Sequence, residues 1–247
     1  MLDIDNSGLD VHVGHPEAYP VQVQGPKAKD TMRDLFGEWV LDMKYYWCAQ
    51  AELDGIPMVI SRTGWTAVVG YEIYLRDPSR GDDLWERILE AGAPYDIRVT
   101  PSSDIRRIEA GIFDYGSDFG LETNPFEVTG LERLVEQQDA DYVGKEALER
   151  IRAEGVKRKL VGIEVEGPAL GYPLTEYWPV SRGGERVGHV TDAVWSPRLK
   201  KTIGYVWVPI ESSTPGTELE VEGPRGRLRG KTAAIPFIDP QKKVPAQ

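Results

Sequence analysis

The stretch S-R-T-G-W-T-A-V-V-G-Y-E-I-Y-L, residues 61–75, decides the fold of the first half of the chain. Its second part predicts a β-strand, because apolar and polar side chains alternate there and successive side chains of a strand point to opposite faces. The apolar set consists of Tyr71, Ile73 and Leu75. Glu72 and Tyr74 therefore share the other face, and Trp65 stands a few residues upstream.

A carboxylate and a phenol on one strand face, with an indole nearby, can bind a flat heterocycle that is rich in hydrogen-bond donors. A carboxylate accepts two parallel hydrogen bonds from an amino-pyrimidine edge, as it does from a guanidinium group. Aromatic rings can cover the faces of such a ligand. The simpler alternative is an ordinary half-buried strand with a solvated Glu72, and spacing alone favours this alternative.

The composition is that of a soluble globular protein, with 40% hydrophobic and 28% charged residues over 247 positions. The formal net charge of −11 argues against general nucleic-acid binding and against adhesion to an anionic membrane surface. No apolar run reaches membrane-spanning length, and the first residues do not form a signal peptide. We therefore expect a cytoplasmic protein.

Cysteine and histidine usage indicates neither a disulfide framework nor a metal site. The single Cys48 excludes an internal disulfide, and we expect it to be a small buried core residue. His12 and His15 are close in sequence, but no pattern supplies a third ligand. No metal ligand is therefore assigned.

Predicted helices and strands alternate over the first part of the chain. The predicted helices span residues 26–36, 82–91 and 145–153. The side chains of the second helix expected to face inward are Leu84, Trp85, Ile88 and Leu89. Ser102 and Ser103 are N-cap candidates for a further helix. A β-hairpin is predicted at residues 49–60, with Asp54-Gly55 as its turn.

From Lys159 onward the pattern changes to short β-rich runs separated by glycine and proline. These runs are residues 160–165, 186–190, 203–208 and 218–222. Such spacing is typical of a compact antiparallel barrel. We therefore predict an α+β protein with a first domain at residues 1–155 and a second domain at residues 156–247.

A series of motifs in this order resembles the glycine cleavage T-protein (aminomethyltransferase) superfamily. In the first domain they are V-Q-G-P-K-A (23–28), L-D-G-I-P-M-V-I-S-R-T-G-W-T (53–66), G-Y-E-I-Y-L (70–75), I-R-R-I-E-A-G (105–111), N-P-F-E-V (124–128) and G-K-E-A-L (144–148). The barrel contributes R-K-L-V-G-I-E-V (158–165), G-H-V-T-D-A-V-W-S-P-R-L-K-K (188–201) and P-G-T-E-L-E-V (215–221). Within this superfamily, three segments are most similar in sequence to the dimethylsulfoniopropionate demethylase-like branch. They are D-I-R-R-I-E-A-G, E-T-N-P-F-E-V and A-V-W-S-P-R-L-K-K.

The resemblance implies a folate-binding T-protein domain of mixed strands and helices, incomplete at its N-terminus, followed by a small antiparallel β-barrel domain. It implies tetrahydrofolate as the cofactor. Glu72 would accept hydrogen bonds from the pterin ring, and Tyr74 and Trp65 would shape or cover the same pocket.

The reaction that the resemblance implies is transfer of a methyl group from a sulfonium or amine donor, a small molecule, to tetrahydrofolate. One alternative is an aminomethyltransferase of the glycine cleavage system, whose partner would be a lipoyl carrier protein. An alternative of another class is a folate-binding accessory protein or an inactive fragment without transferase activity.

Three departures from the family pattern qualify this resemblance. Ser-Ser-Asp at residues 102–104 stands where aminomethyltransferases usually have Ala-Arg-Asp, which disfavours the aminomethyltransferase interpretation. Residues 67–69 lack an acidic residue that is common in the family. The family pattern also extends far upstream of Val23 and includes there an aspartate beside the reacting nitrogen of folate. Asp3, Asp5 and Asp10 lie in no matching motif, so no catalytic residue is assigned, and we expect a fragment or a shortened relative.

Two groups of charged residues have simpler explanations than catalysis. The basic runs are candidates for binding the anionic tail of folate, although such runs are more often solvated surface. They comprise Lys157, Arg158, Lys159, Arg198, Lys200 and Lys201. The second group is expected to form ion pairs on the surface of a helix. It comprises Asp104, Arg106, Arg107 and Glu109.

Overall fold

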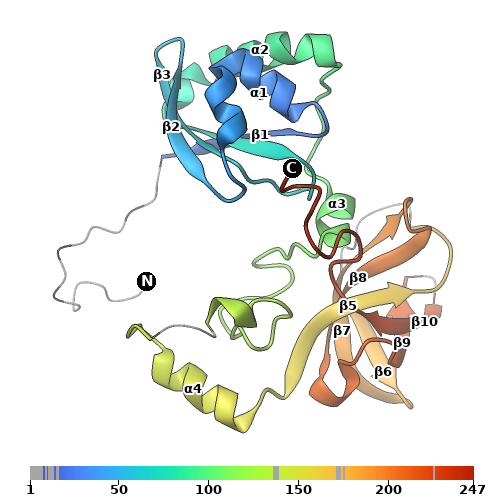
Figure 1. Cartoon of the computed structure of the whole chain (residues 1–247). Helices are drawn as coiled ribbons and strands as arrows, with labels where there is room; N and C mark the ends of the chain where they lie inside the picture. The colour runs from blue at the N-terminus through green and yellow to red at the C-terminus, as the bar shows by residue number, and fades with distance from the viewer. Residues whose placement is uncertain are drawn as a thin grey trace. The chain divides into compact units, whose positions relative to one another are not determined.

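A computed structural model describes residues 8, 10, 14, 17–135, 139–170, 174, 176–224 and 226–247 (Figure 1). The chain divides into two compact units. The first unit comprises the described residues up to Gly64 together with Val68–Thr100 and Val244–Gln247. The second unit comprises Trp65–Ala67 and Pro101–Lys243. Each unit has a sheet and a hydrophobic core of its own.

The first unit is built on a four-stranded antiparallel sheet. Its strands, in the spatial order β1-β4-β3-β2, are β1 (Tyr19–Gln24), β2 (Cys48–Leu53), β3 (Ile56–Ser61) and β4 (Gly70–Leu75). β2 and β3 form the predicted hairpin. Asp54 and Gly55 both have positive φ in its turn, as a tight two-residue hairpin turn requires.

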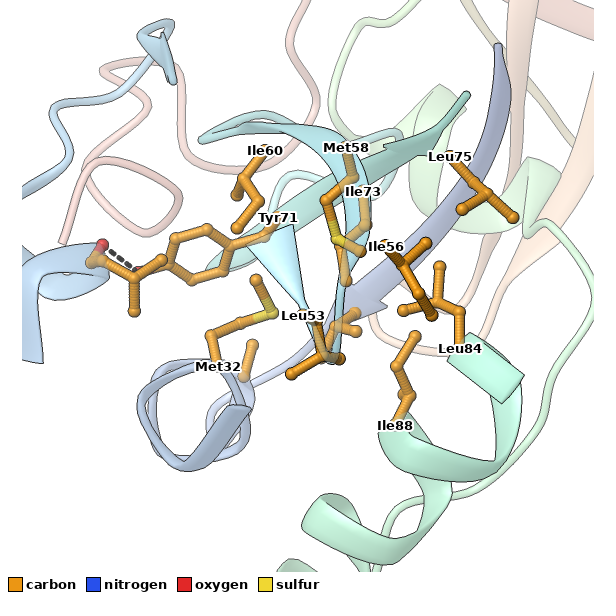
Figure 2. Close-up of a cluster of buried hydrophobic side chains, with 13 residues drawn as sticks. Met32, Leu53, Ile56, Met58, Ile60, Tyr71, Ile73, Leu75, Leu84 and Ile88 are labelled. Atoms are coloured by element: carbon orange, nitrogen blue, oxygen red, sulfur yellow. Dashed lines mark hydrogen bonds between the residues drawn. The ribbon is translucent and has the colours of Figure 1, made fainter. Parts of the chain in front are cut away.

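Two helices cover one face of this sheet (Figure 1). They are α1 (Ala28–Phe36) and α2 (Gly81–Gly92), and short 3-10 helices span Glu38–Asp42, Pro78–Arg80 and Ala93–Tyr95. Figure 2 shows Met32 of α1 and Leu84 and Ile88 of α2 pointing toward the sheet. All three are buried, as are Tyr71 and Ile73 of β4, which belong to the same core.

The alternation predicted for β4 is confirmed, but one prediction for α2 is wrong. Glu72 and Tyr74 are half-buried, whereas the three apolar residues of the strand are buried. Trp85, which was expected to face inward, is 39% exposed. Leu84 and Ile88 are four residues apart and lie on one helix face, and Trp85 lies about 100° around the helix from Leu84.

The second unit contains a closed antiparallel barrel, which confirms the predicted barrel. Its strands follow the spatial order β10-β5-β8-β7-β6-β9. Their bounds are β5 (Arg158–Val165), β6 (Trp178–Arg182), β7 (Glu185–Ser196), β8 (Lys201–Pro209), β9 (Glu218–Gly223) and β10 (Gly226–Ala233). The four predicted β-runs fall within these strands. β6 and β10 were not predicted, because β6 contains Pro179 and β10 has few apolar residues.

Two helices precede the barrel in the second unit: α3 (Asp104–Glu109) and α4 (Lys145–Glu154). Short 3-10 helices span Glu132–Leu134 and Ile210–Ser212. Ile108 of α3 is buried in a cluster with Leu160, Ile203 and Tyr205 of the barrel strands. The other faces of the same strands form a separate cluster inside the barrel, which includes Val161, Ile163 and Val206. β8 is therefore buried on both of its faces.

The expectations for the burial of Cys48 and for the domain boundary have different outcomes. Cys48 is exposed rather than buried, because it is the first residue of β2 and pairs with Ser61 on the sheet face away from the helices. The predicted domain boundary near residue 155 stays a prediction.

We expect the two faces of α2 to respond differently to truncation. Ile88→Ala removes a side chain that is 3% exposed and should lower the free energy of unfolding by about 2–4 kcal/mol. Trp85→Ala should lower it by less than about 1 kcal/mol, because the side chain is already in partial contact with water. Urea unfolding followed by circular dichroism measures both. A larger loss for Trp85→Ala would contradict this packing.

Candidate functional site

Glu72 lies on β4, which pairs with β1 on one side and with β3 on the other. Its register partners are Gln22 on β1 and Ser61 on β3. Cross-strand partners share one face of a sheet, and Tyr74 is two residues along the same strand. The four side chains therefore gather on the sheet face away from α1 and α2.

Neutral donors hold both oxygens of the Glu72 carboxylate. Gln22 Nε2 donates to Oε1 at 3.1 Å, and the Tyr74 hydroxyl donates to Oε2 at 3.2 Å. The Thr63 hydroxyl also donates to Oε2, and Ser61 Oγ lies 2.8 Å from Thr63 Oγ1. Among the described residues no Lys or Arg forms an ion pair with Glu72. The carboxylate is thus oriented by dipoles and keeps its negative charge available to a ligand.

The turn that carries Thr63 is held in place by Gln24 of β1. Its Nε2 donates to the backbone carbonyls of Thr63 at 3.4 Å and Tyr71 at 3.3 Å. The Gln24 side chain occupies the space where a Cβ on Gly64 or Gly70 would lie, within 2.2–2.7 Å. A side chain at either position would displace the end of the Gln24 side chain and disturb its hydrogen bonds to Thr63 and Tyr71.

The phenols around Glu72 remain protonated. Burial, and then the negative charge and hydrogen bond of Glu72, raise the pKa of Tyr74 above its usual value. The pKa of Tyr45 is raised as well, mainly by burial and by its neighbour Tyr46, with a further contribution from Glu72. The rings of Tyr45 and Tyr46 lie 4.1 Å apart. The negative charge of Glu72 therefore also affects Tyr45, which precedes β2.

The structure brings together two of the three predicted cofactor-binding residues. Glu72 and Tyr74 are hydrogen-bonded in the first unit. Trp65 belongs to the second unit, so its role in binding the cofactor stays a prediction. Sequence reasoning missed Gln22 and Thr63 as partners of the carboxylate. The cross-strand register, which the sequence does not display, was needed to find them.

Most of the basic residues proposed for an anionic tail are already paired. Arg158 lies 3.0 Å from Glu127, and its guanidinium lies 4.5 Å from the centre of the Trp207 ring. The remaining pairs are Lys159–Glu132 at 3.5 Å, Arg198–Glu109 at 3.3 Å and Lys201–Glu164 at 2.9 Å. Within the described part of the chain, Lys157 and Lys200 have no ion-pair partner. These two are the better candidates that remain.

The prediction of surface ion pairs on α3 is wrong for Arg107. This guanidinium is 2% exposed and contacts three carboxylates. It lies 2.9 Å from Asp104 and 3.0 Å from Asp118, and it also donates to Asp192 of β7. Three acidic residues that are separated by 88 positions in sequence thus converge on one buried cation, which a local helical pattern cannot reveal.

The same prediction is wrong for Glu109, which is 2% exposed. Its carboxylate accepts a hydrogen bond of 2.6 Å from Ser196 Oγ and one of 3.3 Å from Arg198. Ser196 Oγ in turn accepts from the backbone N–H of Leu199 at 3.1 Å. Glu109 therefore fixes the turn between β7 and β8, and it has a structural role.

Burial perturbs the titration of the carboxylates around Arg107. The pKa of Asp192 is raised to about 6, mainly by burial, although Arg107 opposes this shift. Burial also raises the pKa of Asp118, which accepts hydrogen bonds from the Asp114 backbone, Thr191 and Arg107. One guanidinium does not compensate for the desolvation of two carboxylates, so the pKa values of Asp118 and Asp192 are raised although Arg107 opposes both shifts.

No group of three or more His, Cys, Asp and Glu side chains in the described ranges has the arrangement of a metal site. His12 and His15 lie outside those ranges. Within the same ranges, no helix combines the length and apolar character that crossing a bilayer requires.

Two family domains match the chain and correspond to this architecture. The GCVT N-terminal domain matches residues 5–139, and the glycine cleavage T-protein C-terminal barrel domain matches residues 158–239. The second match contains all strands of the closed barrel. The chain therefore belongs to the glycine cleavage T-protein family.

Known relatives and a solved structure agree with this assignment. The chain is 38% identical to a probable aminomethyltransferase of Pyrococcus abyssi, a match that covers 89% of this chain and 60% of that protein. It is 33% identical to the dimethylsulfoniopropionate demethylase DmdA of Ruegeria pomeroyi, with 89% and 59% covered. The crystal structure of glycine cleavage system aminomethyltransferase T from Bartonella henselae superposes with a TM-score of 0.75 at 22% identity, with 91% and 60% covered. The chain thus spans about 60% of the length of these relatives.

We expect the charge of Asp192 to make the second unit less stable as pH rises. Its folded-state pKa of about 6 lies above the ordinary value of 3.8, so the folded protein binds more protons between these pH values. Asp192→Asn keeps an oxygen that can accept from Arg107 and removes the titration. The parent therefore loses stability between pH 4 and pH 7, and the variant does not lose this contribution. The free energy of unfolding of the variant minus that of the parent should increase by about 1–3 kcal/mol over this range.

Urea unfolding at several pH values measures this difference. Asp139→Asn, a change at an exposed site, is the matched control and should show a difference that does not vary with pH. A difference for Asp192→Asn that is equally constant would contradict a raised pKa.

Proposed function

We propose that this chain binds tetrahydrofolate through Glu72 and belongs to a tetrahydrofolate-dependent one-carbon transferase. The observation that supports this proposal most is that Gln22, Thr63 and Tyr74 orient the Glu72 carboxylate, while no cation in the described part of the chain pairs with it. An oriented carboxylate in a half-buried position suits the amino-pyrimidine edge of a pterin. When bound, tetrahydrofolate supplies the N5 nitrogen that accepts the one-carbon group.

The residues of the site have separate tasks in this proposal. Glu72 accepts hydrogen bonds from the pterin, and Thr63 holds its Oε2 in the required direction. Tyr74 contributes an aromatic ring and a hydroxyl that remains protonated because its pKa is raised. Trp65 is proposed to cover the same ligand. No residue of the chain is assigned to the proton transfer or to the attack on the donor.

An aminomethyl group is the donor group that the relatives support better. The probable aminomethyltransferase of Pyrococcus abyssi has the higher identity to this chain, 38% against 33% for the demethylase. The solved structure is also an aminomethyltransferase. If this donor is correct, the partner is a lipoyl carrier protein that presents the aminomethyl group.

A methyl group from a small sulfonium or amine donor is the second candidate. It is favoured by the similarity to the demethylase and by Ser103, which stands where aminomethyltransferases usually have arginine. In the structure Ser103 caps α3, because its side chain accepts a hydrogen bond of 3.3 Å from the Arg106 N–H. It therefore has a structural role and cannot make a charged contact to folate. A folate-binding accessory function without transfer remains the proposal of another class.

We expect Glu72→Gln to weaken the binding of tetrahydrofolate about tenfold to a hundredfold, because an amide offers only one acceptor where the carboxylate offers two and carries no charge. Quenching of tryptophan fluorescence during titration with 5-methyltetrahydrofolate measures the affinity. Glu52→Gln, on the same face of the sheet in β2, is the matched control and should leave the affinity unchanged.

Equal affinities for Glu72→Gln and the parent would show that this carboxylate does not bind the pterin. If the folded parent shows no response at all to 5-methyltetrahydrofolate, the chain alone does not bind folate, and the whole proposal is wrong for this chain.

The donor is identified by a direct comparison of one-carbon sources. With tetrahydrofolate as the acceptor, we expect the chain to form 5,10-methylene-tetrahydrofolate from an aminomethyl-lipoyl carrier protein, with release of ammonia and the dihydrolipoyl carrier. We expect it to form little 5-methyltetrahydrofolate from dimethylsulfoniopropionate or methylated amines. Chromatographic separation of the folate products distinguishes the two reactions. Product only from the sulfonium or amine donors would establish the second candidate in place of the first.

A further inference from the structure

We propose that Gln22 determines specificity at the Glu72 site by selecting a pterin with an oxygen at position 4 over one with an amino group there. This inference rests on the proposed binding of folate by Glu72. Gln22 is the direct cross-strand partner of Glu72, and its Nε2 lies 3.1 Å from Glu72 Oε1. It lies in none of the motifs that indicated the family.

The contact with Glu72 fixes the orientation of the Gln22 amide. Only the amide nitrogen of Gln22 can donate a hydrogen bond to the Glu72 carboxylate. The amide oxygen is itself an acceptor and cannot bond to a carboxylate oxygen. Rotating the amide by 180° would bring its oxygen toward Oε1 and replace an attraction with a repulsion. The charge of Glu72 strengthens this preference, because hydrogen bonds to ionised groups are the stronger ones.

The oriented amide leaves one N–H for a ligand. An amide nitrogen carries two N–H groups, and one of them is directed to Glu72 Oε1. For the second one, the described residues provide no partner. Gln22 and Glu72 therefore present a row of one donor followed by two acceptors: Gln22 Nε2, Glu72 Oε1 and Glu72 Oε2.

This row is complementary to the edge of a 4-oxo pterin. Such an edge offers the oxygen at position 4 as an acceptor and then the N–H groups at N3 and at the 2-amino substituent as donors. The order along the edge is the same as the order of Gln22, Oε1 and Oε2. Oε1 has a lone pair that Gln22 does not use. Oε2 becomes available when the Tyr74 hydroxyl, whose hydrogen bond of 3.2 Å is the longest at the carboxylate, turns away.

A 4-amino pterin has the opposite polarity at the first position of this row. Its amino group at position 4 is a donor and would face the donor of Gln22. The amide cannot turn to accept from it without losing its bond to Glu72. Gln22 is exposed in the chain alone, and a bound pterin would displace water from its amide. A ligand that reverses the polarity would then leave this amide and its own amino group unpaired.

The experiment compares folic acid with its 4-amino counterpart, which differs only at this position of the ring. We expect the full chain to bind folic acid more tightly, and Gln22→Met to lower the ratio of the two affinities about tenfold. Methionine keeps the length of the side chain and removes the donor. Gln50→Met, at an exposed glutamine on the same sheet face in β2, is the matched control and should keep the parent ratio.

Gln22→Glu provides a second variant, in which an acceptor replaces the donor on the same skeleton. It should move the ratio in the same direction as Gln22→Met. Circular dichroism confirms that each variant is folded, and tryptophan fluorescence measures both affinities.

The outcomes separate this inference from the proposed function. If Glu72→Gln weakens both ligands but Gln22→Met and Gln22→Glu leave their ratio unchanged, the role of Gln22 is wrong and folate binding by Glu72 stands. If Glu72→Gln has no effect, or if the folded chain binds neither ligand, the proposed function is wrong and the inference falls with it. A reduced ratio for both Gln22 variants, with an unchanged ratio for Gln50→Met, supports the role of Gln22.

Discussion

The hydrogen bonds that hold the Glu72 carboxylate are the interaction on which the functional interpretation depends. They join Gln22 of β1, Tyr74 of β4 and Thr63, which follows β3, on one face of the sheet. The opposite face is the hydrophobic core under α1 and α2 (Figure 2). Because the core fixes the register of the strands, it also fixes where the donors stand around the carboxylate. Packing on one side of the sheet thus determines the chemistry on the other side.

The second unit uses its buried charges for a different purpose. Arg107 of α3 binds Asp118 and Asp192, and Glu109 of the same helix holds the turn after β7 through Ser196. A helix of six residues is too short to be stable by itself, so these contacts and the burial of Ile108 define its position. The charges are structural, and they explain why a helix with an acidic and basic pattern is not a surface element.

The sequence predicted local features well and long-range ones only in part. Alternation in residues 70–75 predicted the faces of β4, and the Asp54-Gly55 turn predicted the β2–β3 hairpin, because both signals are contained in a few residues. The pairing of Gln22 with Glu72 and of Arg107 with Asp192 joins residues 50 and 85 positions apart. Such contacts depend on register and on the β-bulge next to Asp192, which composition and periodicity do not encode. Glu72 and Tyr74 were therefore found from the sequence, whereas the donors that orient Glu72 were not.

A crystal structure of the chain with 5-methyltetrahydrofolate tests the central claim most directly. The account predicts that the amino-pyrimidine edge of the pterin lies within hydrogen-bond distance of both Glu72 oxygens, with the oxygen at position 4 toward Gln22. A pterin bound elsewhere on the chain, with Glu72 still bonded only to Gln22, Thr63 and Tyr74, would contradict it.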